Sequence, residues 1–231
     1  MAFGSMIFLE ENLKGLCEKH GLEYADFLDE LDVDHAKDLS IYDLEAIAEE
    51  YEIDLNSLIF KHDFKTSELK EKLSKIKLLV LDVDGVMTDG GMYFTESGDH
   101  FKKFDTKDGM AIKGLTANGF QVAIISSGFT GKAVENRAQV LGIQHCTVNK
   151  EPKLTRLNSI CASLQIEIEN VAMIGDDIND LEVIEKCGFA ACPSDAVQSV
   201  KDKVDLILSK AGGKGCVREF IDEYLLEKRM N

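Results

Sequence analysis

Hydrophobic residues follow two different patterns along the chain, and the pattern changes between residues 60 and 78. Over residues 7–60 they recur every three or four positions, as in Leu13, Leu16 and Cys17. This spacing puts them on one face of a helix, so the region is predicted to fold as short helices. From Lys75 onward, short apolar runs alternate with stretches of helical spacing. Buried strands that alternate with helices are typical of a parallel sheet covered on both faces.

Six apolar runs predict the strands of this sheet: Leu78–Leu81, Gln121–Ile125, Cys146–Val148, Val171–Ile174, Phe189–Ala191 and Leu206–Leu208. The helices predicted between them are Asp108–Ala117, Thr130–Leu141, Lys153–Leu164, Asn179–Lys186 and Ala196–Val200. The fold class is therefore α/β, a Rossmann-like doubly wound parallel sheet. One segment departs from the alternation, because Gly91–Thr95 and His100–Phe104 flank Glu96-Ser97-Gly98-Asp99 and predict a β-hairpin. Since the hairpin comes soon after the first strand, we expect it to form a flap over the site.

Charge separates the same two regions. The formal net charge is −16, and residues 1–66 hold 17 acidic against 5 basic residues while residues 67–231 hold 25 against 21. We therefore predict an acidic helical module over residues 1–66 and an α/β domain over residues 67–231. So acidic a chain is not expected to bind nucleic acid, whose phosphates require Lys and Arg.

Other features of the composition predict a cytoplasmic protein that does not bind membranes. No apolar run approaches the ~20 residues that span a bilayer, and no secretory pattern is present. The six cysteines are scattered without a CxxC pair, which is typical of reduced thiols.

The order of apolar residues in the first module loosely resembles a phage-repressor-type helix-turn-helix domain. Ser40, three residues before Asp43, matches a capping box that would open its third helix. Where such a domain carries a basic recognition helix, this chain has Asp34-His35-Ala36-Lys37-Asp38. We therefore expect no DNA binding. Two roles stay open, a packing or oligomerisation appendage and a binding site for a protein partner.

Acidic residues follow two of the predicted strands. Asp82 and Asp84 come directly after Leu78–Leu81, and Gly175-Asp176-Asp177 comes directly after Val171–Ile174. Ligands bind at the carboxyl ends of the strands in open parallel sheets, so these acids are expected to meet there. Carboxylate oxygens without His or Cys suit a hard cation such as Mg²⁺.

Groups that bind an anion follow at the same edge. Ser126-Ser127-Gly128 comes after Gln121–Ile125 and offers hydroxyl and backbone N–H groups at a helix start. Lys153 opens a later helix and supplies a positive charge. A carboxylate nucleophile, a metal and fixed positive charge are what phosphoryl transfer through an aspartyl-phosphate requires. The pattern therefore predicts an enzyme that transfers phosphoryl groups.

The segments LLVLDVDGVMTDG, AIISSGF, Lys153 and MIGDDINDLEV resemble, in this order, the four motifs of haloacid dehalogenase-type phosphatases. The likeness runs from about Lys75 to the last residues. TDGGMYFTESGDHFKKFDTKDGMAIK, NRAQVLGI and AGGKGCVREFIDEYL resemble, more narrowly, the 3-deoxy-D-manno-octulosonate 8-phosphate phosphatases and their sialic-acid and Kdn 9-phosphate relatives. Only the hairpin, one helix and one strand separate the motifs, so the resemblance implies a capless fold of this superfamily.

The resemblance implies a role for each matching residue. Asp82 would be the nucleophile and Asp84 the general acid and base. Mg²⁺ would be held by Asp82, the backbone carbonyl of Asp84 and Asp176, with Asp177 or Asp180 orienting its waters. The phosphoryl group would be bound by Lys153 and by Ser127, with Ser126 as the alternative hydroxyl. The implied substrate-binding positions are Asp84, Asp105, Thr106, Lys107, Asp108, Gly109, Lys113, Gly128, Arg137 and Lys153.

The implied activity is hydrolysis of the terminal phosphate of an ulosonic acid, in the synthesis of surface sugars such as those of lipopolysaccharide. The exact sugar stays open, since Phe129 stands where the octulosonate enzymes carry Arg and some Kdn enzymes Glu. Other functions also stay open: a phosphatase of another small sugar phosphate, phosphoryl transfer or mutation between sugar positions, and a non-catalytic oligomerisation or regulatory protein on the same fold.

The resemblance also implies a homotetramer whose hairpins form a shared barrel. In such an assembly Gly212-Gly213-Lys214-Gly215 would begin a C-terminal tail that covers the adjacent subunit's site. The alternative for this segment is a glycine-rich turn before a last helix.

Overall fold

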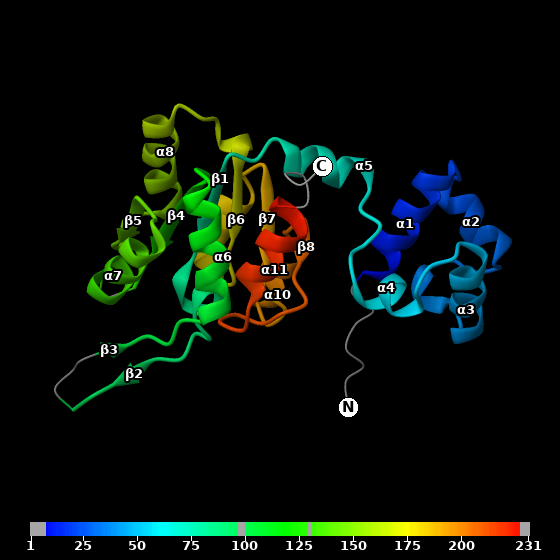
Figure 1. Ribbon diagram of the computed structural model, residues 1–231, viewed down its shortest axis with the longest axis horizontal. Coiled ribbons are helices and arrows are strands. Elements are labelled where there is room, and N and C mark those ends of the chain that lie inside the picture. Colours follow the sequence, from blue (N-terminus) through cyan, green and yellow to red (C-terminus); the bar gives the residue numbers. More distant parts are fainter. Residues whose placement is uncertain (1–7, 97–99, 129–130, 227–231) are drawn as a thin grey trace. The chain divides into compact units, whose positions relative to one another are not determined.

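A computed structural model describes residues 8–96, 100–128 and 131–226 (Figure 1). The chain divides into two compact units, Met1–Glu71 and Lys72–Asn231. Helix α5, Ser67–Ser74, contains this division and begins at the boundary expected from the change in charge. Phe129 and the hairpin turn residues Ser97, Gly98 and Asp99 lie outside the described residues.

The first unit consists of short helices around one apolar cluster. They are α1 Leu9–His20, α2 Tyr24–Glu30, the 3₁₀ turn η1 Ala36–Asp38, α3 Ile41–Glu50 and α4 Leu55–Phe60. The predicted capping box opens α3, because Asp43 N donates to Ser40 Oγ (3.3 Å) and Ser40 N donates to the Asp43 carboxylate (2.7 Å). The acidic stretch that replaces a basic recognition helix forms the single turn η1.

Asn12 on α1 is the polar centre of this unit. Its side chain is fully buried, and its amide nitrogen donates to the carbonyl oxygens of Ser57 (3.3 Å), Leu58 (2.8 Å) and Lys61. Its amide oxygen accepts from Phe64 N at 3.0 Å. The last carbonyls of a helix have no partner within the helix, so Asn12 satisfies groups that α4 leaves open.

Replacing Asn12 with Leu is expected to lower the free energy of unfolding of this unit by about 3 kcal/mol. The substitution keeps the size of the side chain but leaves several buried backbone groups without a partner. Urea unfolding followed by circular dichroism measures the change. Lys14→Ala is the control, because it removes the exposed i,i+4 pair with Glu10 and the contact of Lys14 with the Tyr24 ring, and should cost about 1 kcal/mol or less. Equal losses in the two variants would contradict the role given to Asn12.

The second unit is built on a six-stranded parallel sheet, which confirms the predicted fold class. Its strands are β1 Leu78–Leu81, β4 Gln121–Ser126, β5 His145–Val148, β6 Val171–Ile174, β7 Phe189–Cys192 and β8 Leu206–Ile207. Their order in the sheet is β5-β4-β1-β6-β7-β8. Strand β1 thus pairs with β4 on one side and β6 on the other. The chain order reverses at β1, and ligands of doubly wound sheets bind at such a point.

Helices cover both faces of the sheet. They are α6 Thr106–Ala117, α7 Gly131–Leu141, α8 Lys153–Leu164, α9 Leu181–Ile184, α10 Gln198–Lys201 and α11 Cys216–Phe220, with 3₁₀ turns η3 Ile168–Asn170 and η4 Ile178–Asp180. Leu78 and Val80 of β1 belong to the buried cluster that includes α8, α9 and α10. Leu79 and Leu81 point to the opposite face. Helices α6 and α11 lie side by side there (Figure 1).

The predicted hairpin is present, with shorter strands than expected. Strands β2 Tyr93–Phe94 and β3 His100–Phe101 pair antiparallel, and a bridge joins Thr88 to Phe104 at the base. The hairpin extends away from the sheet (Figure 1). Its apolar side chains are largely exposed, at 59% for Met92, 58% for Phe94 and 60% for Phe101.

The glycine-rich segment after β8 is a turn before a last helix, which corrects the expectation of a tail reaching an adjacent subunit. Cys216, Val217 and Phe220 are fully buried, and α11 packs against α6 of its own chain. The helix continues as a π-helical turn, η5 Ile221–Leu225.

This segment also supports the loop after β1. Gly213 N donates to Val86 O at 2.9 Å, and the Cys216 thiol contacts the same carbonyl at 3.4 Å. At Gly212 the backbone approaches Gly85 O so closely that any Cβ would overlap it.

Over the part of the chain that the structure describes, none of the helices has the length and apolar content needed to cross a membrane.

Candidate active site

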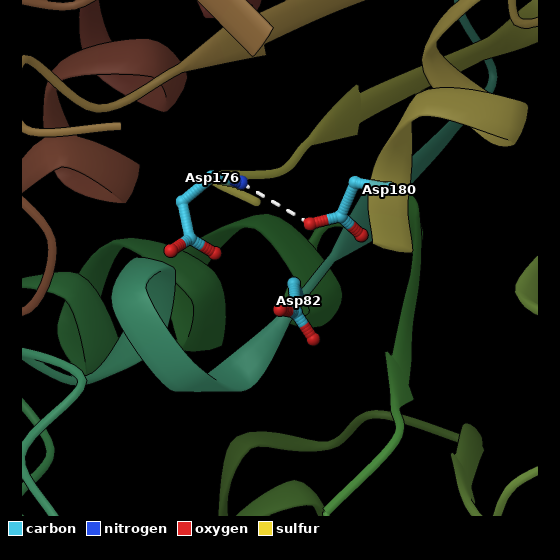
Figure 2. Close-up of side chains that lie close together, drawn as sticks. All are labelled: Asp82, Asp176 and Asp180. Carbon is cyan, nitrogen blue, oxygen red and sulfur yellow. Dashed lines mark hydrogen bonds between the residues drawn. The ribbon is translucent and has the colours of Figure 1, made fainter. Parts of the chain in front are cut away.

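Three carboxylates converge where the carboxyl ends of β1 and β6 meet (Figure 2). Asp82 follows β1, Asp176 follows β6 through Gly175, and Asp180 ends the turn η4. Each offers an oxygen, and the three oxygens lie within 4.8 Å of one another. Asp82 and Asp180 are buried, with 4% and 0% of their surface exposed. The sheet topology therefore brings together the acids that the sequence placed at two separate strand ends.

Lys153 supplies positive charge to this cluster. It opens α8, and its Nζ lies 3.0 Å from Asp82 Oδ1 and 2.6 Å from Asp180 Oδ1. Its side chain is only 2% exposed. A buried charge is tolerated when it is paired and hydrogen-bonded, and Lys153 meets both conditions.

Asp180 holds the loop that presents Asp176. Its second oxygen accepts hydrogen bonds from Asp176 N at 3.1 Å, drawn in Figure 2, and from Asp177 N at 3.5 Å. With both oxygens occupied in this way, Asp180 acts on the site through Lys153 and the loop backbone. The Asp177 side chain is exposed and borders the pocket, so it is the better placed of the two to reach the waters of a metal.

Burial and mutual repulsion raise the pKa of two of these acids. Burial raises the pKa of Asp82 to about 7, the charge of Asp180 adds to the rise, and Lys153 opposes it. Burial likewise raises the pKa of Asp176 to about 8, with further contributions from Asp82 and Asp180. The single positive charge of Lys153 does not neutralise three neighbouring carboxylates, and a divalent cation would supply the remaining positive charge.

The surroundings of Asp176 fit such a cation. Its Oδ1 is buried and has no hydrogen-bond partner among the described residues. Gly85, in the π-helical turn η2 Val83–Met87, has φ of 89°, and a Cβ there would overlap the Asp176 carboxylate. Only glycine suits both the positive φ and the lack of room for a Cβ. Asp82 and Asp176 are the side chains that would hold Mg²⁺, and the predicted third ligand is the backbone carbonyl of Asp84.

Asp84 points into the pocket and forms an ion pair with Lys102. Lys102 was not among the residues predicted for the site from the sequence. It directly follows β3 and lies at the base of the hairpin, where its side chain is 11% exposed. A lysine beside a hairpin strand has no sequence feature that predicts a role in the site. The one indication was the prediction that the hairpin lies over the site.

The open space above these residues is a pocket of about 420 Å³, lined by Asp82, Asp84, Gly90, Met92, Lys102, Ser126, Ser127, Gly128, Asp177 and Asn179. The predicted phosphate-binding loop therefore faces the predicted nucleophile. Within the loop, Ser126 Oγ accepts from Gly128 N at 3.2 Å. Ser127 Oγ accepts from Arg156 Nη2 at 3.4 Å, which leaves its own O–H free to donate toward the pocket. Ser126 is 1% exposed whereas Ser127 is half-buried, so Ser127 is the more accessible of the two hydroxyls for a phosphate.

Substitution of the two serines should separate their roles. Ser127→Ala is expected to raise the inhibition constant of inorganic phosphate about 10-fold, because it removes a hydrogen bond to a charged group. Ser126→Ala removes the acceptor for Gly128 N and should instead cost about 1 kcal/mol of unfolding free energy. Phosphate inhibition and thermal unfolding of both variants provide the measurement. A larger rise of the inhibition constant in Ser126→Ala would assign the phosphate to Ser126.

The remaining predicted residues form a separate network around the start of α6. Asp105 caps α6 by accepting from Lys107 N (2.7 Å) and Asp108 N (3.0 Å), and Arg137 Nη2 donates to Asp105 O at 3.2 Å. Gly109 gives the Arg137 guanidinium room, since a Cβ there would overlap it. Asp108 is buried and accepts from Arg218 N at 2.7 Å.

Within the described residues, none of the seven residues predicted to bind the sugar acid around α6 and on α7 lines the pocket of this single chain: Asp105, Thr106, Lys107, Asp108, Gly109, Lys113 and Arg137. Thr106, Lys107 and Lys113 are exposed on α6.

Comparison with known proteins points to one family of enzymes. The profile of haloacid dehalogenase-like hydrolases matches residues 103–188. The 3-deoxy-D-manno-octulosonate 8-phosphate phosphatase of Escherichia coli strain B is 38% identical over 161 residues, which cover 70% of this chain and 85% of that protein. The solved phosphatase of this name from Yersinia pestis is 35% identical with a TM-score of 0.67, covering 71% of this chain and 88% of its own.

A further solved structure bears on the cofactor. The phosphatase of the same name from Moraxella catarrhalis, in complex with a magnesium ion, a phosphate ion and a KDO molecule, is 34% identical with a TM-score of 0.66. The alignment covers 69% of this chain and 91% of that one. Its magnesium ion and the acidic cluster described above agree with the Mg²⁺ predicted from the sequence. The chain is a phosphoric monoester hydrolase and belongs to the 3-deoxy-D-manno-octulosonate 8-phosphate phosphatase family of the haloacid dehalogenase-like hydrolases.

Proposed function

We propose that this enzyme removes the terminal phosphate of an eight- or nine-carbon ulosonic acid through an aspartyl-phosphate on Asp82, with 3-deoxy-D-manno-octulosonate 8-phosphate as the first candidate substrate. The names of its relatives support this choice of substrate. The observation that carries the chemistry is the Asp82 carboxylate. It lines the pocket, is 4% exposed, and lies 3.0 Å from the ammonium group of Lys153.

The residues of the pocket divide the reaction into two steps. In the first, an Asp82 oxygen attacks phosphorus, the bond from phosphorus to the sugar oxygen breaks, and Asp84 donates a proton to that oxygen. In the second, Asp84 takes a proton from a water that attacks the same phosphorus, which releases phosphate and restores Asp82. Lys102 holds the Asp84 carboxyl over the pocket.

The charges around the pocket suit the transferred group. Lys153 and the Ser127 hydroxyl would bind its oxygens as they gain negative charge in the transition state. When bound, Mg²⁺ would neutralise charge on phosphate and on the carboxylates. Because Lys153 is fixed by Asp82 and Asp180, its ammonium group needs no rearrangement when the substrate arrives.

A panel of substrates tests the proposal: 3-deoxy-D-manno-octulosonate 8-phosphate, N-acetylneuraminate 9-phosphate, Kdn 9-phosphate and simple hexose phosphates, each with Mg²⁺ and with EDTA. We expect one ulosonic acid to be hydrolysed far faster than the others, and only with metal. Metal-dependent hydrolysis of all members at similar rates would keep the mechanism and reject the substrate class. Absence of phosphate release from every member would reject both.

We also infer a homotetramer in which the hairpins pack against one another. The exposed side chains of Met92, Tyr93, Phe94 and Phe101 lie on one short hairpin, and a hydrophobic cluster of this kind is typical of an interface. Light scattering of the wild type and of Phe94→Asp is the test, with a smaller mass expected for the variant. A monomeric mass for the wild type would reject the tetramer.

The acidic helical module should be dispensable for turnover, because every residue placed in the pocket lies after Lys75. A chain that begins at Ser67 is expected to keep its kcat within about twofold, since the removed helices belong to a compact unit of their own. Steady-state kinetics of the shortened and full-length chains gives the comparison. A folded but inactive shortened chain would place a catalytic role in the module.

A further inference from the structure

Arg156 is a buried cation that the steps described above do not use. It lies on α8, three residues after Lys153, and is 3% exposed. Within the described residues its guanidinium makes no ion pair with a carboxylate. Instead it donates to uncharged oxygens at the ends of two strands. An arginine is seldom kept in such a place without a role, because removing its charge from water is costly.

The hydrogen bonds of Arg156 converge on the phosphate-binding loop. Its Nη1 donates to Ser126 O at 2.8 Å and to Thr147 O at 3.3 Å, which ties the ends of β4 and β5 together. Its Nη2 donates to Ser127 Oγ at 3.4 Å. The planar guanidinium thus fixes both the backbone and the hydroxyl of the loop, as a flexible lysine could not.

The direction of the Ser127 contact matters for its function. Because Arg156 occupies a lone pair of Ser127 Oγ, the hydroxyl proton is directed away from Arg156. Ser127 lines the pocket and Arg156 does not, so the pocket is open to this proton. A cation behind a hydroxyl also polarises it and makes it a stronger donor to an anion. The Arg156 charge would add to that of Lys153 in attracting a phosphate dianion.

We propose that Arg156 is a positioning residue that orients the Ser127 hydroxyl, so that the phosphate-binding loop is ready to bind a phosphoryl group, with its buried charge as a smaller contribution. This inference rests on the proposed function of the pocket. A purely structural role, the joining of β4 to β5, predicts a loss of stability without a specific loss of phosphate affinity.

Arg156→Met separates these roles. Methionine fills the space without charge or donors, and Ser126 O keeps its hydrogen bond from Asn149 N at 3.2 Å. We expect the inhibition constant of inorganic phosphate and the KM of the substrate to rise about 10-fold, with a smaller change in kcat. The matched control is Lys203→Met, which removes one positive charge from an exposed pair with Glu185 and should leave both constants within about twofold.

A double-mutant cycle identifies Ser127 as the group through which Arg156 acts. If Arg156 acts mainly by orienting this hydroxyl, Arg156→Met should have little further effect on phosphate affinity in a Ser127→Ala chain. Full additivity, or an unchanged inhibition constant in Arg156→Met, would overturn the proposal. Should Arg156→Met not fold, Arg156→Lys provides the test. It keeps the charge but loses the paired donors, so a raised inhibition constant is expected and an unchanged one would overturn the proposal.

Calorimetry of inorganic phosphate binding to the Mg²⁺-loaded chains keeps this test separate from that of the proposed function. A wild type that binds phosphate but hydrolyses none of the ulosonic acid phosphates would reject the proposed substrate and leave the Arg156 comparison intact. A wild type that binds no phosphate would overturn the inference about Arg156.

Discussion

Asp82→Asn is expected to reduce kcat by about 10⁴-fold or more, since the amide cannot attack phosphorus and form the covalent intermediate. The substitution preserves the size of a side chain that is 4% exposed, so the sheet around it should remain intact. Phosphate release at saturating substrate, measured with Mg²⁺, gives the result. Asp202→Asn is the control, because that side chain is exposed and accepts a hydrogen bond from Gln198 far from the pocket residues in sequence, and its kcat should stay within about twofold.

The stability of Asp82→Asn should change in the opposite direction to its activity. Burial and the charge of Asp180 raise the pKa of Asp82 from 3.8 to about 7, so the ionised form is costly in the metal-free fold. Neutral asparagine avoids this cost, and the metal-free variant should unfold at the same temperature as the wild type or higher.

Residual kcat above about one hundredth of the wild type in a pure sample would contradict the role of Asp82 as nucleophile.

Lys153→Met is expected to be inactive and also less stable by about 3 kcal/mol at pH 8 in the absence of metal. The substitution leaves Asp82 and Asp180 buried without their shared cation, which lies 3.0 Å from one and 2.6 Å from the other. Urea unfolding with circular dichroism measures the loss. Lys203→Met, which breaks an exposed pair, should cost less than about 1 kcal/mol.

The loss in Lys153→Met should depend on pH. Lys153 lowers the pKa of both Asp82 and Asp176, so its removal raises both further above the ordinary value of 3.8. A carboxyl with a raised pKa destabilises the fold only when it is ionised in the unfolded chain, so the penalty is absent below about pH 4 and grows as pH rises through 7 and 8. The stability gap between Lys153→Met and the wild type should therefore widen from pH 4 to pH 8. A gap that does not vary with pH would show that Lys153 acts mainly through packing.

The clustering of the acids could be predicted because it depends on chain topology. Apolar runs such as Leu78–Leu81 and Val171–Ile174 can be buried only as central strands, and parallel strands bring their carboxyl ends to one edge. The residues that follow each run then meet at this edge, so the sequence predicts that Asp82 and Asp176 lie together. Lys153 was found for a related reason, as the first residue of α8.

Contacts that depend on side-chain direction could not be predicted. Arg156 has the spacing of an ordinary helical arginine, and only the packing of α8 under β4 directs it to the loop. Lys102 reaches Asp84 because the base of the hairpin returns to the pocket. For Gly212–Gly215 the sequence allowed a tail or a turn, and the burial of Val217 and Phe220 decides for the turn. The sequence also left open whether Asp177 or Asp180 orients the waters of a metal. Asp177 is exposed and Asp180 is buried, and this difference favours Asp177.

The support that the last helix gives to the loop after β1 bears on how the enzyme is made. Asp82 leaves the ribosome early, but Gly213 and Cys216, which bind the Val86 carbonyl, follow roughly 130 residues later. At the usual speed of translation this interval is about 10 s. Until then the loop after β1 lacks its hydrogen bonds from Gly213 and Cys216, and β1 lacks its neighbouring strand β6 for part of this time. A nascent chain should therefore be inactive for most of its synthesis. Activity is therefore expected only after Gly213 and Cys216 have been made and have bound the Val86 carbonyl.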